Sequence, residues 1–151
     1  MNVDAVSCLV SDQHYLLPLV KVVEIAPMVS ITPIAGLNAP VIGYVQFRGK
    51  PIAVIDLAMR LGFPHASERL TDHMVVVDLT DRRVAVRVDR VLELVSSDGA
   101  LEPLEQSASP LTGILQTPEG CRVIVDLEEL LDLEQRRQLD TPLAKLESEL
   151  A

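Results

Sequence analysis

Short runs rich in valine and isoleucine alternate along the chain with clusters of turn-forming residues. The pattern predicts nine strands, at residues 3–10, 15–20, 41–47, 51–55, 74–79, 83–88, 91–95, 111–116 and 122–125. Several neighbouring pairs flank a short polar loop, such as Arg48-Gly49-Lys50, of the length that joins antiparallel strands. Because the strands are short, evenly spaced and interrupted by little helix, we expect an antiparallel barrel or sandwich rather than alternating β-α units.

Two of the predicted strands run into a short helical pattern in the same way. Asp56 follows the strand at 51–55, and Asp126, 70 positions later, follows the strand at 122–125. Each aspartate stands where a carboxylate caps a helix by accepting backbone N–H bonds. A carboxylate pair for acid–base chemistry is the alternative interpretation. The recurrence predicts two similar lobes, each ending in a strand, a cap and a helix.

The C-terminal segment carries a different pattern. We expect Asp140 or Thr141 to cap a helix that has Pro142 in its first position. An apolar stripe at helical spacing runs along this segment, formed by Leu139, Leu143, Leu146 and Leu150. Two interpretations stay open, because the stripe either packs on the chain's own strands or docks onto a partner. We therefore expect one domain of two lobes over residues 1–135, followed by a helical tail at 136–151.

Composition restricts the classes of partner. The 151 residues carry 13 Lys and Arg against 22 Asp and Glu, a net charge of −9, and they include no Trp. Because nonspecific binding to nucleic acid or anionic lipid needs Lys and Arg at phosphates, we expect neither partner. Residues 25–47 form an uncharged stretch long enough to span a bilayer, yet three prolines and two glycines interrupt it. Since no basic residue precedes Lys21 to open a signal peptide, we expect a cytoplasmic protein without membrane insertion.

Candidate catalytic and metal-binding residues are sparse. No spacing typical of metal ligands joins His14, His65 and His73 to one another or to Cys8 and Cys121. The sequence contains no CxxC, no glycine-rich phosphate loop and no nucleophile elbow. We expect reduced, buried cysteines, with a single long-range disulfide as the alternative, and solvated loop histidines. The prediction is a protein that is not an enzyme and that binds no metal or cofactor.

Arg48 is the polar residue that stands out. It lies beside Gly49 at a strand–strand corner, and the nearest charged residue before it is Glu24. One interpretation is an ordinary solvated turn arginine, and another is an ion pair between Glu24 and Arg48 that holds two corners together. If exposed, such a pair stabilises the fold by at most about 1 kcal/mol. The third interpretation is a specific role for Arg48 in binding.

Four segments resemble motifs of the CheW-like family, in the same order along the chain. Residues 43–57, GYVQFRGKPIAVIDL, resemble the signature G-x-x-N-L-R-G-x-x-x-P-V-I/V-D-L. Residues 15–25, YLLPLVKVVEI, resemble Y-x-L/I-x-I/L-x-x-V-x-E-I/V, and residues 83–91 resemble R-x-G/A-L/I-x-V-D-x-V. Residues 124–131 resemble the closing element, so the match covers about residues 6–132. Gln46, Ala53 and Ala58 replace the usual Asn, the usual Pro and an Arg often found after the Asp-Leu pair.

The resemblance implies both a fold and a function. The implied fold is mainly β, with two interlocked five-stranded β-barrel lobes, short helices and a C-terminal amphipathic helix. The implied function is a non-enzymatic scaffold that couples the cytoplasmic tips of chemoreceptors to the regulatory domain of a CheA-type histidine kinase. By motif position, the site includes the family's functional arginine, the acidic position near it and positions associated with partner contacts. The expected partner-binding residues are Arg48, Glu24, Val22, Gly43, Val91 and Leu94.

Two other functions stay open on the sequence. A small-molecule-binding or enzymatic β-barrel would use Asp56, Asp126 and the histidines as polar groups, and ligand-dependent thermal stabilisation would favour it. A decoy adaptor of a parallel, non-flagellar pathway would bind only the receptor or only the kinase. A true coupling scaffold would associate with membrane-bound receptor arrays.

Overall fold

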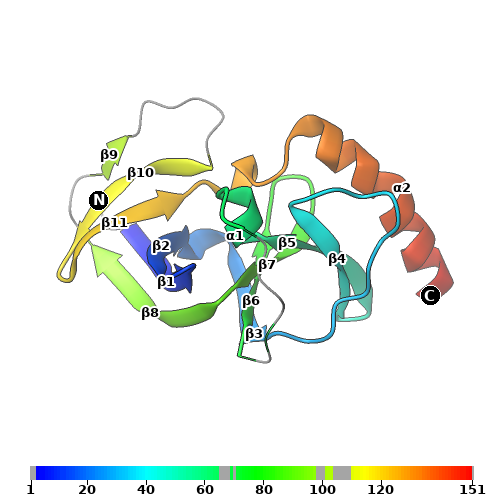
Figure 1. Ribbon diagram of the computed structural model, residues 1–151, viewed down its shortest axis with the longest axis horizontal. Coiled ribbons are helices and arrows are strands. Elements are labelled where there is room, and N and C mark those ends of the chain that lie inside the picture. Colours follow the sequence, from blue (N-terminus) through cyan, green and yellow to red (C-terminus); the bar gives the residue numbers. More distant parts are fainter. Residues whose placement is uncertain (1–2, 65–68, 70, 98–100, 104–109, 151) are drawn as a thin grey trace.

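A computed structural model describes residues 3–64, 69, 71–97, 101–103 and 110–150 of the chain, and two α-helices and eleven strands lie within them (Figure 1). The first strands are β1 (Val3–Val10), β2 (Gln13–Pro18), β3 (Val22–Pro27), β4 (Val41–Phe47) and β5 (Lys50–Asp56). The later strands are β6 (His73–Asp78), β7 (Arg83–Val88), β8 (Arg90–Ser97), β9 (Leu101–Pro103), β10 (Leu111–Thr117) and β11 (Gly120–Val125). The helices are η1 (Leu19–Lys21), α1 (Leu57–Arg60), η2 (Leu127–Glu129) and α2 (Leu133–Leu150), where η marks a 3-10 turn.

The strands form two sheets that lie side by side (Figure 1). One sheet has six strands in the order β8-β1-β2-β11-β10-β9, and the other has five in the order β3-β6-β7-β5-β4. Each sheet contains one parallel pair, β11 with β2 and β5 with β7, and its other pairs are antiparallel. The five-stranded sheet comes from one continuous stretch of chain, whereas the six-stranded sheet takes strands from both sides of that stretch.

The predicted mainly-β fold with two lobes and short helices is confirmed, but the description as two five-stranded barrels needs correction. One sheet has six strands, and no pairing among the described residues joins β8 to β9 or β3 to β4. A barrel requires a continuous ladder of hydrogen bonds around the sheet. Here the outer edge of β4 is instead taken by an isolated bridge from Tyr44 to Thr32. Both lobes are therefore open, coiled sheets.

All nine predicted strands are present, three of them (β1, β4 and β7) with the predicted bounds and six with shifted ends, and β3 and β9 are additional. The first hairpin turn is tighter than predicted, because Ser11 and Asp12 adopt φ values of 50° and 63° and Val10 pairs directly with Gln13. Such a two-residue turn matches the twist of antiparallel strands. The strand predicted to reach residue 20 ends at Pro18, and η1 follows it.

The two halves repeat one local design at an offset of 70 residues. In the first copy the Asp56 N–H donates to the Pro40 carbonyl, and in the second the Asp126 N–H donates to that of Pro110. Each aspartate side chain then accepts the N–H two residues later, at 3.0 Å for Asp56 and 3.1 Å for Asp126. The predicted capping role of both aspartates is confirmed. The register also repeats, since both hairpins shift by one residue near their first glycine, Gly43 or Gly113.

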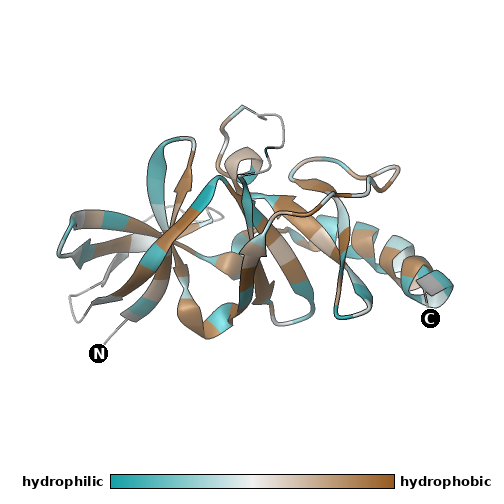
Figure 2. Ribbon diagram, turned by 90° about the horizontal axis from the view of Figure 1, so that it is seen from below, coloured by the Kyte–Doolittle hydropathy of each residue, from teal (hydrophilic) through white to brown (hydrophobic). Residues whose placement is uncertain are grey.

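One apolar core is shared by the two sheets. Its largest cluster joins Val6 and Leu17 of the six-stranded sheet to Ile55 and Val86 of the five-stranded sheet. Hydrophobic residues colour the middle of many strands, while hydrophilic residues mark several hairpin ends (Figure 2). Because the cluster spans both sheets, the lobes are parts of one packed body.

A buried charge cluster lies inside this body. The Arg87 guanidinium, which is almost completely buried, bonds Asp72 at 2.9 Å, Asp89 at 3.1 Å and Asp56 at 3.2 Å. Burial of ionised groups is tolerated only where each is paired and hydrogen-bonded. Arg87 on β7 therefore ties the cap of α1 to the loop before β6 and to the end of β7.

Helix α2 starts earlier than the sequence pattern predicted. The Asp132 carboxylate accepts the Gln135 N–H at 2.7 Å, and the Gln135 side chain accepts the Asp132 N–H at 2.8 Å. This reciprocal capping box begins the helix at Leu133, so the expected cap at Asp140 or Thr141 is wrong and Pro142 lies inside the helix. Proline there omits one helical hydrogen bond.

The apolar stripe of α2 packs on the chain itself. Leu139 is fully buried in the shared core, and Leu143 packs against the same cluster. The side chain of Leu150 lies outside the described residues. The first interpretation of the stripe, packing on the chain's own strands, is confirmed for these two leucines.

Candidate partner-binding surface

The structure brings Glu24 and Arg48 together. Glu24 lies on β3 and Arg48 at the tip of the β4–β5 hairpin, and Arg48 Nη2 is 3.7 Å from Glu24 Oε1. The side chains are 62% and 44% exposed, so the pair adds at most about 1 kcal/mol to stability. At 3.7 Å the contact is longer than a hydrogen bond. The guanidinium therefore keeps its N–H donors open toward solvent within the described part of the chain.

The hairpin turn fixes where Arg48 sits. Phe47 pairs with Lys50, which leaves Arg48 and Gly49 as a two-residue loop with φ values of 52° and 82°. Positive φ at both positions defines the hairpin turn whose twist suits antiparallel strands. Arginine adopts this region only at some cost, while glycine enters it freely. The turn places the Arg48 guanidinium carbon 4.8 Å from the centre of the Phe47 ring.

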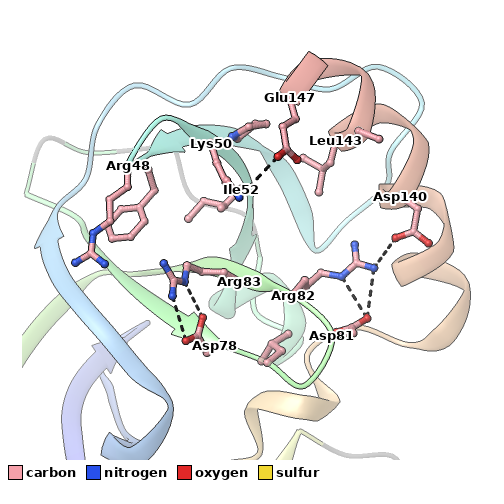
Figure 3. A pocket seen from close by; sticks show the side chains of 14 residues that line it. Arg48, Lys50, Ile52, Asp78, Asp81, Arg82, Arg83, Asp140, Leu143 and Glu147 are labelled. Atoms are coloured by element: carbon pink, nitrogen blue, oxygen red, sulfur yellow. Dashed lines mark hydrogen bonds and ion pairs between the residues drawn. The ribbon is translucent and has the colours of Figure 1, made fainter. Parts of the chain in front are cut away.

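A second arginine approaches the same ring from β7. The Arg83 guanidinium carbon lies 5.8 Å from the centre of the Phe47 ring. Arg83 also donates two bonds to Asp78 on β6, from Nε at 2.7 Å and from Nη2 at 3.2 Å (Figure 3). The hydrogen bond from Arg83 holds the pKa of the Asp78 carboxyl below its usual value. The ring of Phe47 thus contacts two guanidinium groups, each with its own carboxylate.

A hollow of about 780 Å³ adjoins this surface between the β4–β5 hairpin, the β6–β7 turn and α2. Its apolar lining includes Ile52 and Leu143, and paired charges surround it (Figure 3). Arg82 bonds Asp140 of α2 at 2.7 Å, which ties the helix to the β6–β7 turn. The charges that line the hollow therefore bind mainly to one another and hold α2 against the sheet.

The other expected site residues lie elsewhere. Val22 opens β3 and is half-buried, across from Val77 of β6. Val91 and Leu94 lie on β8 in the six-stranded sheet, where Val91 is half-buried and Leu94 is 66% exposed. The structure thus brings Glu24 and Arg48 into contact on one sheet and places Val91 and Leu94 on the other.

Gly43 is buried where another segment crosses β4. A Cβ atom at Gly43 would lie 2.4 Å from the carbonyl oxygen of Thr32, and the glycine has a φ of 149°. Thr32 and Tyr44 exchange two backbone hydrogen bonds beside it, at 2.9 and 2.8 Å. Gly43 therefore permits this close approach of two backbones. Its contact with a partner remains a prediction.

Sequence reasoning missed the most exposed of the large apolar side chains described. Val20 on η1 is 90% exposed, on the connection between the two sheets. The chain was expected to be extended there, so Val20 was counted as a strand residue. Pro18 is the signal that could have revealed it, because proline lacks the N–H that a strand ladder needs and tends to end a strand.

The cysteines and histidines that the sequence singled out differ in burial. Burial raises the pKa of the Cys8 thiol to about 12, whereas Cys121 is exposed, so its expected burial is wrong; both cysteines are free. His14 is exposed, but His73 opens β6, is half-buried and holds a buried Nδ1 without a hydrogen-bond partner in the described structure. His65 lies outside the described residues.

Neither a metal site nor a membrane-spanning helix is found among the described residues. Among them, no group of three or more His, Cys, Asp or Glu side chains is arranged to hold a metal ion. None of the helices described is both long enough and apolar enough to cross a membrane.

Comparison with known proteins identifies the family. Residues 4–135 match the family model described as the CheW-like domain. The chain is 26% identical over 133 residues to the chemotaxis protein CheW of Rhizobium meliloti (strain 1021), covering 84% of this chain and 86% of that protein. It is also 26% identical over 135 residues to the chemotaxis protein CheW of Klebsiella aerogenes, covering 85% of this chain and 81% of that protein.

A solved structure agrees with this assignment. The crystal structure of the scaffolding protein TtCheW from Thermoanaerobacter tengcongensis matches with a TM-score of 0.80 and 26% identity, covering 89% of this chain and 96% of that one. The strand–cap–helix repeat and the Arg48 hairpin lie within the matched residues 4–135. The chain belongs to the CheW-like family.

Proposed function

We propose that this protein is a chemotaxis-type adaptor that couples chemoreceptor tips to the regulatory domain of a CheA-type histidine kinase. The observation that carries the proposal is the exposed Arg48 at the tip of the β4–β5 hairpin, paired loosely with Glu24. The N–H groups of Arg48 can donate hydrogen bonds to a carboxylate of the partner. Little free energy is lost in doing so, because the existing ion pair with Glu24 is solvated and weak. The CheW relatives support this adaptor role.

A coupling protein needs a second contact surface on the same body. Leu94 on β8 and Val20 on η1 have exposed aliphatic side chains, and both belong to elements other than the β4–β5 hairpin that carries Arg48. Contiguous exposed apolar patches commonly mark surfaces that bind other proteins. We place a second partner contact at Leu94, Val91 and Val22, with Val20 as an addition to the expected set. Because one core joins the two sheets, a contact on either sheet is mechanically linked to the other.

This role requires no bond chemistry. Assembly geometry alone brings receptor and kinase together, and the adaptor contributes affinity and orientation. The partner proteins place it at the cytoplasmic end of the receptor arrays. We propose no cofactor, metal or nucleic acid for it.

Titration calorimetry with two purified probes tests the proposal: the regulatory domain of a CheA-type kinase and a cytoplasmic receptor-tip fragment. Each is titrated separately, so that an adaptor of one partner is distinguished from a coupler of two. We expect both probes to bind the wild-type protein. We expect Arg48→Glu to weaken the affinity for at least one probe about tenfold or more, because it reverses a charge at the proposed interface.

The matched control is Arg137→Glu, which makes the same charge reversal at an exposed arginine of α2. Urea unfolding of both variants checks that the fold is intact. Failure of the wild type to bind either probe would overturn the proposed function. Wild-type affinity of a folded Arg48→Glu protein would remove Arg48 from the site.

A further inference from the structure

The ring of Phe47 lies close to two arginine side chains. Arg48 and Arg83 come within 4.8 and 5.8 Å of its centre, from the hairpin tip and from the neighbouring β7. Both contacts require an aromatic ring at position 47, because an aliphatic side chain has no π face.

The ring itself is well anchored. Phe47 is 7% exposed and belongs to the apolar cluster that includes Val45 and Ile52 of the same hairpin. Arg83 is held independently by its two hydrogen bonds to Asp78, a bidentate arrangement that restricts the guanidinium in both position and plane. The ring and Arg83 therefore form a fixed pair beside the hairpin tip.

Arg48 is the most exposed member of this group. Its side chain is 62% exposed, and its pair with Glu24 is too long for a hydrogen bond. A free arginine side chain loses rotamer entropy when it is fixed, and a preorganised one loses less on binding. The Phe47 face supplies a resting position that restricts Arg48 without using its N–H donors.

We propose that Phe47 and Arg83 are positioning residues for Arg48: they hold its guanidinium on the ring face with the donors directed to a carboxylate of the partner. Arg83 acts by fixing the ring, and Asp78 acts by fixing Arg83. The proposal rests on the proposed function, because it assigns the binding role to Arg48. It adds a chemical requirement, an acidic side chain on the partner at the Arg48 contact.

The test measures affinity for whichever of the two probes, kinase regulatory domain or receptor tip, Arg48→Glu binds more weakly. Each exposed cation–π contact corresponds to about a two- to fivefold change in a binding constant. We expect Arg83→Gln and Phe47→Leu each to weaken binding by about this factor, and Arg83→Lys to recover part of the loss. The double variant should be no weaker than Phe47→Leu alone, because Arg83 acts through the ring. Arg137→Gln is the control that removes an exposed cation elsewhere.

A background without Arg48 makes the test specific. In Arg48→Ala, the further change Arg83→Gln should leave affinity unaltered if Arg83 only positions Arg48. An equal loss with and without Arg48 would show that Arg83 contacts the partner itself, and it would overturn the proposal. Urea unfolding midpoints of all variants report any general loss of stability.

A measurement on the free protein separates this proposal from the proposed function. The Arg48 Nε–Hε signal in a ¹H–¹⁵N spectrum should carry a ring-current shift from Phe47 that disappears in Phe47→Leu and decreases in Arg83→Gln. If the signal is unchanged in both variants, the positioning role is wrong even when the kinase domain binds. If the shifts behave as expected but no probe binds, the coupling function fails and the positioning geometry stands.

Discussion

Gly43→Ala isolates the close approach of two backbones beside the candidate surface. The added Cβ would lie 2.4 Å from the Thr32 carbonyl oxygen and 3.0 Å from its carbon, so the Thr32 segment has to move. Movement breaks the two hydrogen bonds between Thr32 and Tyr44, which are worth about 0.5–1.5 kcal/mol each. Backbone strain from the positive φ adds about 1–2 kcal/mol. We expect a total loss of about 2–5 kcal/mol in the free energy of unfolding.

Gly36→Ala is the matched control. Gly36 also has a positive φ, at 82°, but a Cβ there meets no atom within 4 Å. This variant should therefore show the backbone strain alone, about 1–2 kcal/mol. Urea unfolding followed by circular dichroism gives both values, and an unchanged slope with denaturant confirms that the two variants unfold like the wild type.

The comparison also tests the binding role expected for Gly43. If Gly43→Ala and Gly36→Ala differ by less than about 0.5 kcal/mol, the close approach is not what constrains this glycine. If folded Gly43→Ala binds the kinase domain with wild-type affinity, Gly43 acts through the fold. Weaker binding without extra instability would instead indicate a contact with the partner.

Three further predictions concern the core, α2 and the thiols. Arg87→Met should destabilise the fold by about 3–5 kcal/mol in urea, since it strands buried carboxylates; a loss below about 1 kcal/mol would contradict the buried cluster. Leu139→Ala should cost about 2–5 kcal/mol and exposed Leu133→Ala almost nothing, and equal costs would argue against docking of α2. Iodoacetamide should modify Cys121 and not Cys8 in the native protein, as detected by mass spectrometry. Because folding raises the pKa of Cys8 from 9.0 to about 12, the free energy of unfolding should fall as the pH rises from about 9 to about 12.

Features set by neighbouring residues were predictable from the sequence. The caps at Asp56 and Asp126 were predicted correctly, because a cap depends on the strand before it and the helix after it. The start of α2 was predicted wrongly, because the prediction rested on the preference of Pro142 for a first helical position and did not consider the Asp132–Gln135 capping box. The proline and the capping box are both local signals, and the stronger one, the capping box, sets where the helix begins.

Features that depend on distant pairing were less accessible. β3 escaped prediction because its edge position tolerates Glu24 and Pro27, which obscure the strand pattern. The Glu24–Arg48 pair was foreseen as one interpretation, since the two charges flank an uncharged stretch. The contact of Arg83 with the Phe47 ring was not, because it requires β7 to pair in parallel with β5 and so to begin beside the β4–β5 hairpin.

The order of the strands along the chain has a consequence for synthesis. All five strands of the β3-β6-β7-β5-β4 sheet are complete once residue 88 has left the ribosome. The β1–β2 hairpin, although made before that sheet, lacks one or both of its neighbours β8 and β11 until residue 125 has emerged. Domains tend to fold as their segments appear, and unpaired strand edges invite aggregation meanwhile. This hairpin, which precedes the five-stranded sheet in the chain, is therefore fully paired only after that sheet is complete, and chaperone binding during translation should concentrate on it.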